Sequence, residues 1–182
     1  MNILLDAIDI GPAKGRPRLN VIVEFEEDYK RLKNGPLEID SNVTISILRE
    51  FSDIAGQIKF QKDFDPRKVL LIVSNFSEEV MIYAAQQFIR RDVEALIQKF
   101  SSDRMWKIAS QSKEIVAFFL DEIAKNSAVI NGAGERIRQA CYDLIKRYDA
   151  FNYITPQNLS VLFDSKENLD KNFQGNLFYY FR

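Results

Sequence analysis

The spacing of apolar residues changes near residue 75, and this change limits the folds open to the chain. Before it, apolar residues alternate with polar ones or form short runs, as in residues 18–27 and 69–73, which is typical of β-strands. After it, they recur every three or four positions, as in residues 81–100 and 137–148, which is typical of amphipathic helices. Strands that precede helices predict an α+β fold, with an N-terminal antiparallel-rich sheet and a C-terminal group of packed helices.

The β-rich part covers residues 1–75. Residues 3–10 and 18–27 are predicted to pair as a hairpin around the loop GPAKGRP, whose glycines and prolines favour a turn. Residues 41–55 carry both spacings; a helix is favoured because apolar residues share one helical face and Gly56 suits a helix end. Residues 57–61 and 68–73 are predicted as further strands.

The α-rich part covers residues 76–182. Helices are predicted over 76–100, after Asn75 as N-cap, and over 105–123 and 137–148. A further helix is predicted to begin at Thr155 and Pro156, because proline suits the first helical position. The end, NLFYYFR, is predicted as a last strand or as an apolar tail packed on the body.

No internal repeat is visible in the sequence. The length of 182 residues fits a single domain spanning 1–182. The β-rich part alone would be a marginal independent fold, because a short chain buries a smaller fraction of its surface.

The chain contains no histidine and a single cysteine, Cys141. These counts exclude Ser-His-Asp and Cys-His catalysis, histidine-bound metals, and thiolate zinc or iron–sulfur sites. We therefore predict no cofactor and no resident metal. Cys141 lies on a helical apolar stripe and is predicted to be a core residue.

The chain is also predicted to be cytoplasmic. A lone cysteine allows no intrachain disulfide, which favours a reducing compartment. The first residues, MNILLDAIDI, lack the basic segment of a signal peptide. The apolar run 69–73 is far shorter than the roughly 20 residues of a membrane span, so no membrane association is expected.

Carboxylates could still support catalysis without histidine. Asp6 and Asp9 on the first predicted strand could lie beside Glu24 and Glu26 on the second. Such a cluster could bind Mg²⁺ or act as an acid and base pair, which gives the alternative of a carboxylate-dependent enzyme on a phosphoryl or glycosyl substrate. The competing interpretation is a solvated sheet face.

The segment NGAG, residues 131–134, precedes a helix, where free amide groups can bind an anion. It lacks the Gly-Lys-Ser/Thr end of a P-loop. A plain link between two helices is the simpler interpretation.

Basic and acidic residues follow one another closely in the β-rich part. Lys plus Arg number 25 and Asp plus Glu number 26, so the chain carries no overall positive charge that would attract nucleic acid. A nucleic-acid-binding protein is therefore only the second alternative. Neighbouring blocks of both signs suit a protein partner.

We predict a cytoplasmic protein-binding module, for example an immunity or antitoxin protein that neutralises a cognate toxin. The predicted partner-binding residues are Lys14, Arg16, Arg18, Glu24, Glu26, Glu27 and Asp28. Nothing in the sequence specifies self-association.

Overall fold

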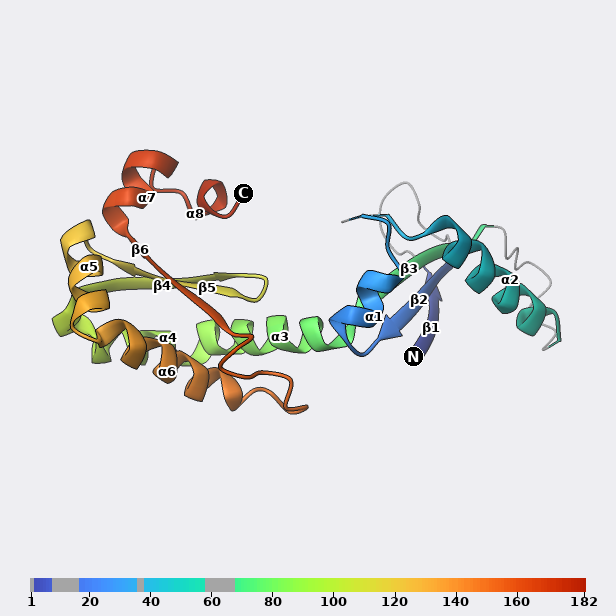
Figure 1. Ribbon diagram of the computed structural model, residues 1–182, viewed down its shortest axis with the longest axis horizontal. Coiled ribbons are helices and arrows are strands. Elements are labelled where there is room, and N and C mark those ends of the chain that lie inside the picture. The colour runs from blue at the N-terminus through green and yellow to red at the C-terminus, as the bar shows by residue number, and fades with distance from the viewer. Residues whose placement is uncertain (1, 8–16, 36–37, 58–67) are drawn as a thin grey trace. The chain divides into compact units, whose positions relative to one another are not determined.

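The computed structural model describes residues 2–7, 17–35, 38–57 and 68–182 (Figure 1). The chain is of mixed α and β structure, as the sequence predicts. Its contacts divide it into two compact units, Met1–Glu79 and Val80–Arg182. The described core residues of each unit pack among themselves. The division does not test whether the chain is a single domain, which therefore stays a prediction from the sequence.

The first unit is built on a three-stranded sheet. The predicted hairpin is confirmed: β1 (Asn2–Ala7) pairs antiparallel with β2 (Pro17–Val23). On the other side of β2, β3 (Leu70–Asn75) pairs in parallel, so the sheet holds one antiparallel and one parallel pair. Two helices connect β2 to β3, namely α1 (Glu26–Arg31) and α2 (Ser41–Gln57). The helix favoured for residues 41–55 is thus confirmed.

Helices α1 and α2 cover one face of this sheet (Figure 1). Leu19 and Val21 of β2 are fully buried there, and Tyr29, Ile47 and Phe51 of the two helices pack against them. The strand predicted to reach residue 27 ends at Val23. It ends because the acidic residues that follow begin α1, where a helix N-terminus favours negative charge. Of the strand predicted over 57–61, Gln57 ends α2, and residues 58–61 lie outside the described ones.

The second unit contains a second three-stranded sheet. Helices α3 (Phe76–Arg91) and α4 (Val93–Lys99) precede it. Its strands are β4 (Met105–Gln111), β5 (Glu114–Phe119) and β6 (Ser160–Ser165). Helices α5 (Glu122–Ile130) and α6 (Ala133–Lys146) join β5 to β6, and α7 (Lys166–Phe173) and α8 (Leu177–Tyr180) follow. The group of helices predicted for this half therefore surrounds a sheet.

The helix predicted over residues 105–123 is wrong, because this segment forms the antiparallel hairpin β4–β5. Every residue from Ile115 to Phe119 is buried. In a strand that is covered on both faces, apolar residues do not alternate with polar ones. The sequence of such a strand cannot be told from that of a buried helix by its spacing. The turn contains Ser112, at a φ of 55°, without the Asn-Gly pair that usually marks a hairpin.

The helix predicted to begin at Thr155 and Pro156 is also wrong. These residues form a turn, which Asn158 closes by accepting a hydrogen bond from the Thr155 amide at 2.8 Å. The chain then enters β6, which pairs in parallel with β5. Pro156 therefore marks a turn that precedes a strand, a role that proline fills as readily as a helix start.

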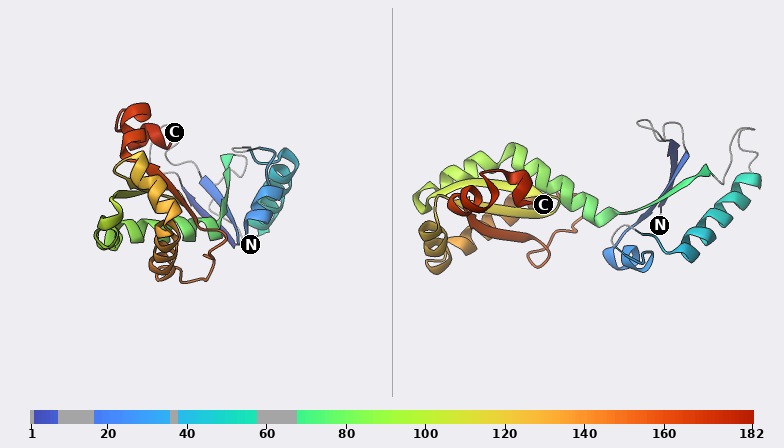
Figure 2. Two further views of the ribbon diagram at one scale, coloured as in Figure 1. Left: turned by 60° about the vertical axis from the view of Figure 1, so that its left-hand side comes forward. Right: turned by 90° about the horizontal axis from the view of Figure 1, so that it is seen from above.

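Both faces of the second sheet are covered (Figures 1 and 2). Ile115, Ala117 and Phe119 of β5 face the core that α3, α4, α5 and α6 complete. Val116 and Phe118 face the opposite side, where Leu169 of α7 and the C-terminal residues pack. The NLFYYFR end forms α8, with Tyr180 against Phe118 at a ring-centroid distance of 5.1 Å.

The two units repeat one order of elements. Each has a hairpin, then two helices, then a strand parallel to the second hairpin strand, then a helix that begins at the next residue. In each, the second hairpin strand is central, flanked by one antiparallel and one parallel neighbour. The sequences of β3, LLIVSN, and β6, SVLFDS, share a pattern of burial more than residues, which is why no repeat is visible in the sequence.

Candidate functional site

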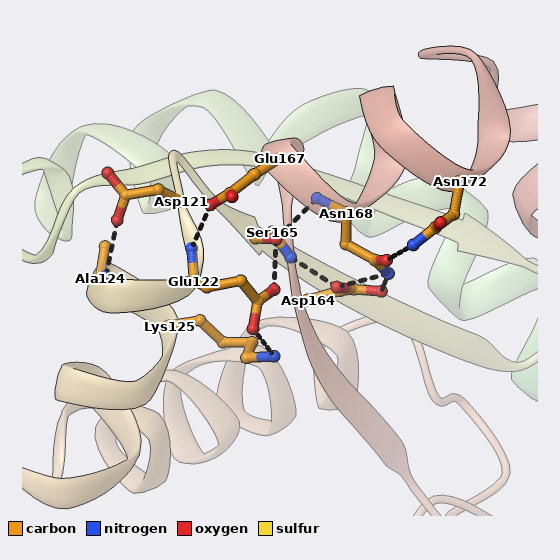
Figure 3. Close-up of polar contacts among 9 residues, drawn as sticks. All are labelled: Asp121, Glu122, Ala124, Lys125, Asp164, Ser165, Glu167, Asn168 and Asn172. Carbon is orange, nitrogen blue, oxygen red and sulfur yellow. Dashed lines mark hydrogen bonds and ion pairs between the residues drawn. The ribbon is translucent and has the colours of Figure 1, made fainter.

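Helices α5 and α7 begin beside each other, where β5 and β6 end (Figure 3). The Asp121 carboxylate accepts a hydrogen bond from the Ala124 amide at 2.8 Å and caps α5. Ser165, which is fully buried, accepts one from the Asn168 amide at 2.9 Å and caps α7. Both residue types are preferred at this position, because their oxygens satisfy amides that lack an intrahelical partner.

Glu122 connects the two caps (Figure 3). One of its carboxylate oxygens accepts a hydrogen bond from the Ser165 hydroxyl, and the other pairs with Lys125 at 2.6 Å. Lys125 and Ser165 together lower the pKa of Glu122. The Glu122 amide in turn donates to Glu167 at 3.3 Å, and Asp121 pairs with Arg104 at 2.6 Å. Since all these carboxylates are occupied, this network acts as a tie between two helix starts.

Beside this tie, α5 exposes an apolar surface. Ile123 and Ile130 are 78% and 86% exposed and lie seven residues apart on one side of the helix. We call Ile123 and Ile130 the α5 apolar face. Leu120, which precedes the helix, and Val129, in its last turn, flank this face and are also exposed, at 43% and 59%. On its other side, α5 packs through the buried Ala124 and Ala128.

The sequence does not predict the α5 apolar face. The helix predicted over 105–123 ends at Ile123, and the next feature predicted along the chain is the NGAG link at 131–134. The spacing of Ala124 and Ala128 was the available signal, because two small residues one turn apart allow a helix to pack closely and leave its larger residues outside.

Among the described residues, the predicted carboxylate cluster is not brought together. Asp6 is paired with Arg18 in the backbone register, at one end of the hairpin. Glu24 and Glu26 follow the other end of β2, and Glu24 lies six positions after Arg18, about 20 Å at 3.3 Å per position. Asp9 lies outside the described residues. Within the described ranges, no group of acidic or cysteine side chains could hold a metal ion.

The predicted partner-binding residues are only partly described, since Lys14 and Arg16 lie outside. Arg18 is half-buried on β2, and Glu24 is exposed in the bend after it. Glu26, Glu27 and Asp28 form the first turn of α1. Glu26 pairs with Lys30 at 3.0 Å and Asp28 with Arg31 at 3.4 Å. The acidic run is therefore a solvent-facing helix start, and its partner-binding role stays a prediction.

In the NGAG segment, one amide is taken by a side chain and one glycine is closely packed. The Ala133 amide donates to the Asn131 side chain at 2.8 Å. Gly134 is buried, and a Cβ there would lie 3.1 Å from the Phe163 ring. These contacts make the segment a tight link between α5 and α6.

The shifted pKa values in the described part of the chain all move away from neutrality. Burial raises the pKa of Cys141 to about 12, and burial with Asp164 raises that of Tyr180. A hydrogen bond to Asp92 raises the pKa of Tyr148. Backbone hydrogen bonds, above all from Val43, lower that of Asp40.

Among the described residues, no helix combines the length and the apolar character needed to cross a membrane. Comparison with protein-family models, with curated proteins and with solved structures finds no match to this chain.

Proposed function

We propose that this chain is a cytoplasmic protein-binding module and that its partner docks on the α5 apolar face. The exposure of Ile123 and Ile130 is the observation that carries the proposal. Isolated apolar residues are common on surfaces, but neighbouring ones on a single helix face are typical of interaction sites. Fully burying one isoleucine contributes about 1.5–3 kcal/mol, so two of them can dominate a small interface.

Each shifted pKa stabilises the form that already prevails at neutral pH. The acidic run of α1 is a second candidate contact, through exposed carboxylates at Glu24, Glu27 and Asp28. Carboxylates at a rim steer a basic partner more than they add affinity.

The proposal is tested by affinity purification with quantitative mass spectrometry. The bait is the full chain, compared with the double variant Ile123→Lys/Ile130→Lys. We expect the wild type to recover a partner in stoichiometric amount. The double variant should bind this partner about a hundredfold more weakly, because losing each isoleucine contact of about 1.4 kcal/mol lowers the affinity tenfold.

The matched control is Ile45→Lys/Ile54→Lys on α2. Ile45 and Ile54 are also exposed helical isoleucines, at 65% and 52%, and this double variant adds the same charge. We expect it to retain the partner. Retention of the partner by Ile123→Lys/Ile130→Lys, or equal loss in both double variants, would contradict a docking role for α5.

Toxin neutralisation is the more specific form of the proposal. Its test is co-expression of the chain with the toxin domain recovered as its partner, scored by cell survival. The wild-type chain should restore growth and Ile123→Lys/Ile130→Lys should not. If the recovered partner has no toxic activity, the proposal keeps its binding role and loses the antitoxin one.

A further inference from the structure

The exposed side of α5 has the same pattern of residues in both directions along the helix. Ile123, Asn126, Ser127 and Ile130 are all exposed, and their spacing of three, four and seven positions places them on one helix face. From either end, this face presents an isoleucine, two short polar residues and an isoleucine. Such a face is complementary to a second copy of itself that runs in the opposite direction.

A twofold axis through the midpoint between residues 126 and 127 would pair two such faces. Ile123 of each copy then lies against Ile130 of the other, so both isoleucine contacts form twice. Asn126 of the two copies would meet close to the axis, where each amide side chain can donate to and accept from the other. Apolar contacts on both sides of one polar contact are the arrangement that fixes the register of paired helices.

The charges at the two ends of α5 favour the antiparallel orientation. At its start, the exposed Glu167 carboxylate accepts a hydrogen bond from the Glu122 amide at 3.3 Å. At its end, the exposed Arg136 guanidinium donates to the Asn131 carbonyl at 3.4 Å. Antiparallel helices bring these opposite charges toward each other, whereas parallel helices bring like charges together. Neighbouring ion pairs add no net charge: Asp121 with Arg104 and Glu122 with Lys125 at the start, and Glu135 with Arg138 at the end.

We propose that a second copy of this chain occupies the α5 apolar face, through an antiparallel pair of α5 helices. The proposal rests on the proposed function in treating this face as an interaction site, and it names the occupant of the face when no other partner is bound. The contact is small, because the nine residues of α5 span only about 13 Å. Interfaces below the standard size are weak, so the dimer has a Kd on the order of 0.1 mM.

Sedimentation equilibrium of the full chain alone tests the dimer, at concentrations from about 10 µM to about 1 mM. The mass of the wild type should rise from that of a monomer toward that of a dimer. Ile123→Lys and Ile130→Glu should each raise the Kd more than tenfold, because each places a charge against an isoleucine. The matched control is Ile45→Lys on α2, at an isoleucine that is 65% exposed, and it should dimerise like the wild type.

An equal mixture of Ile123→Lys and Ile130→Glu tests the orientation of the pair. In an antiparallel pair, the new lysine lies against the new glutamate, and the remaining Ile130 and Ile123 contact each other. The mixture should therefore form a heterodimer at concentrations where each variant alone is a monomer. In a parallel pair, both substitutions face an isoleucine, and the mixture stays monomeric.

Three results would overturn the proposal: a wild type that stays monomeric up to about 1 mM, a dimer that both substitutions leave unchanged, or a mixture that does not recover the dimer. These results leave the proposed function intact, because recovery of another partner through α5 is measured separately. Conversely, a chain that dimerises in this way but recovers no other partner would contradict the proposed function alone.

Discussion

At the scale of single residues, Asp149 is the most constrained charge in the described part of the chain. Its side chain is fully buried just after α6 and pairs with Lys146 at 2.7 Å. The amides of Tyr153 and Ile154 donate to its two oxygens at 3.0 and 2.8 Å. Lys146 also donates to the Ile154 carbonyl at 3.0 Å. This one carboxylate therefore fixes the path of the chain from α6 toward β6.

We expect Asp149→Asn to lower the free energy of unfolding by about 2–3 kcal/mol at pH 7. The variant removes a buried charge that is hydrogen-bonded on both oxygens and leaves Lys146 without its partner. Urea denaturation followed by circular dichroism measures the change. Asp143→Asn, at an exposed position on α6, is the control and should stay within about 0.5 kcal/mol of the wild type.

The pH dependence of stability provides a second test of the same residue. Burial opposes ionisation of Asp149, but the hydrogen bonds from Lys146, Ile154 and Tyr153 outweigh it and lower the pKa. A carboxyl group whose pKa is lower in the folded state stabilises the fold above its unfolded pKa of about 3.9. This contribution is lost as the pH falls through the folded pKa. Wild type and Asp149→Asn should therefore converge in unfolding free energy as the pH falls below the unfolded pKa and through the lower folded one, and a constant difference would contradict the assignment.

At the scale of secondary-structure elements, the tie between α5 and α7 depends on Ser165. This hydroxyl accepts from the Asn168 amide and donates to Glu122, so it serves two helices. We expect Ser165→Ala to lower the free energy of unfolding by about 1–2 kcal/mol, the usual cost of a lost N-cap. Thermal or urea unfolding measures the change.

Ser160→Ala is the matched control, because Ser160 begins the same strand that Ser165 ends. Glu122→Gln tests the second contact, since the amide oxygen can still accept from Ser165. Its effect should be smaller than that of Ser165→Ala, because Glu122 is 40% exposed and exposed ion pairs contribute little. A Ser165→Ala variant as stable as Ser160→Ala would show that the cap does not stabilise α7.

The elements show where sequence patterns suffice. Helix 41–57 was predictable because its apolar residues share one helical side, and strand β3 because its apolar run is short. The β4–β5 hairpin was not, since β5 is buried on both faces and its turn lacks glycine. The same holds for the candidate site. The sequence excludes histidine-dependent chemistry, but it does not predict the α5 apolar face, because the start of α5 depends on where the β4–β5 hairpin ends.

At the scale of the whole molecule, the repeated order of elements could not be read from the sequence. What the units share is the pairing of strands, namely a central strand with one antiparallel and one parallel neighbour. Such a pattern constrains burial and leaves residue identity free: the central strand buries Leu19, Val21 and Val23 in one unit, and Ile115, Ala117 and Phe119 are among those buried in the other. Parallel pairing across two connecting helices also lies beyond the range of local sequence signals.

The separate cores predict that residues 76–182 fold without the rest of the chain. This fragment begins with the complete helix α3 and contains every described residue of the two cores of the second unit, including Ala84 and Phe88 of α3. At just over 100 residues it is within the usual size of a domain. We expect cooperative urea unfolding, and amide chemical shifts that match those of the same residues in the full chain. The control fragment 92–182 lacks α3 and uncovers the core, so it should not unfold cooperatively. A fragment 76–182 that is unfolded by circular dichroism would show that the second unit depends on the first.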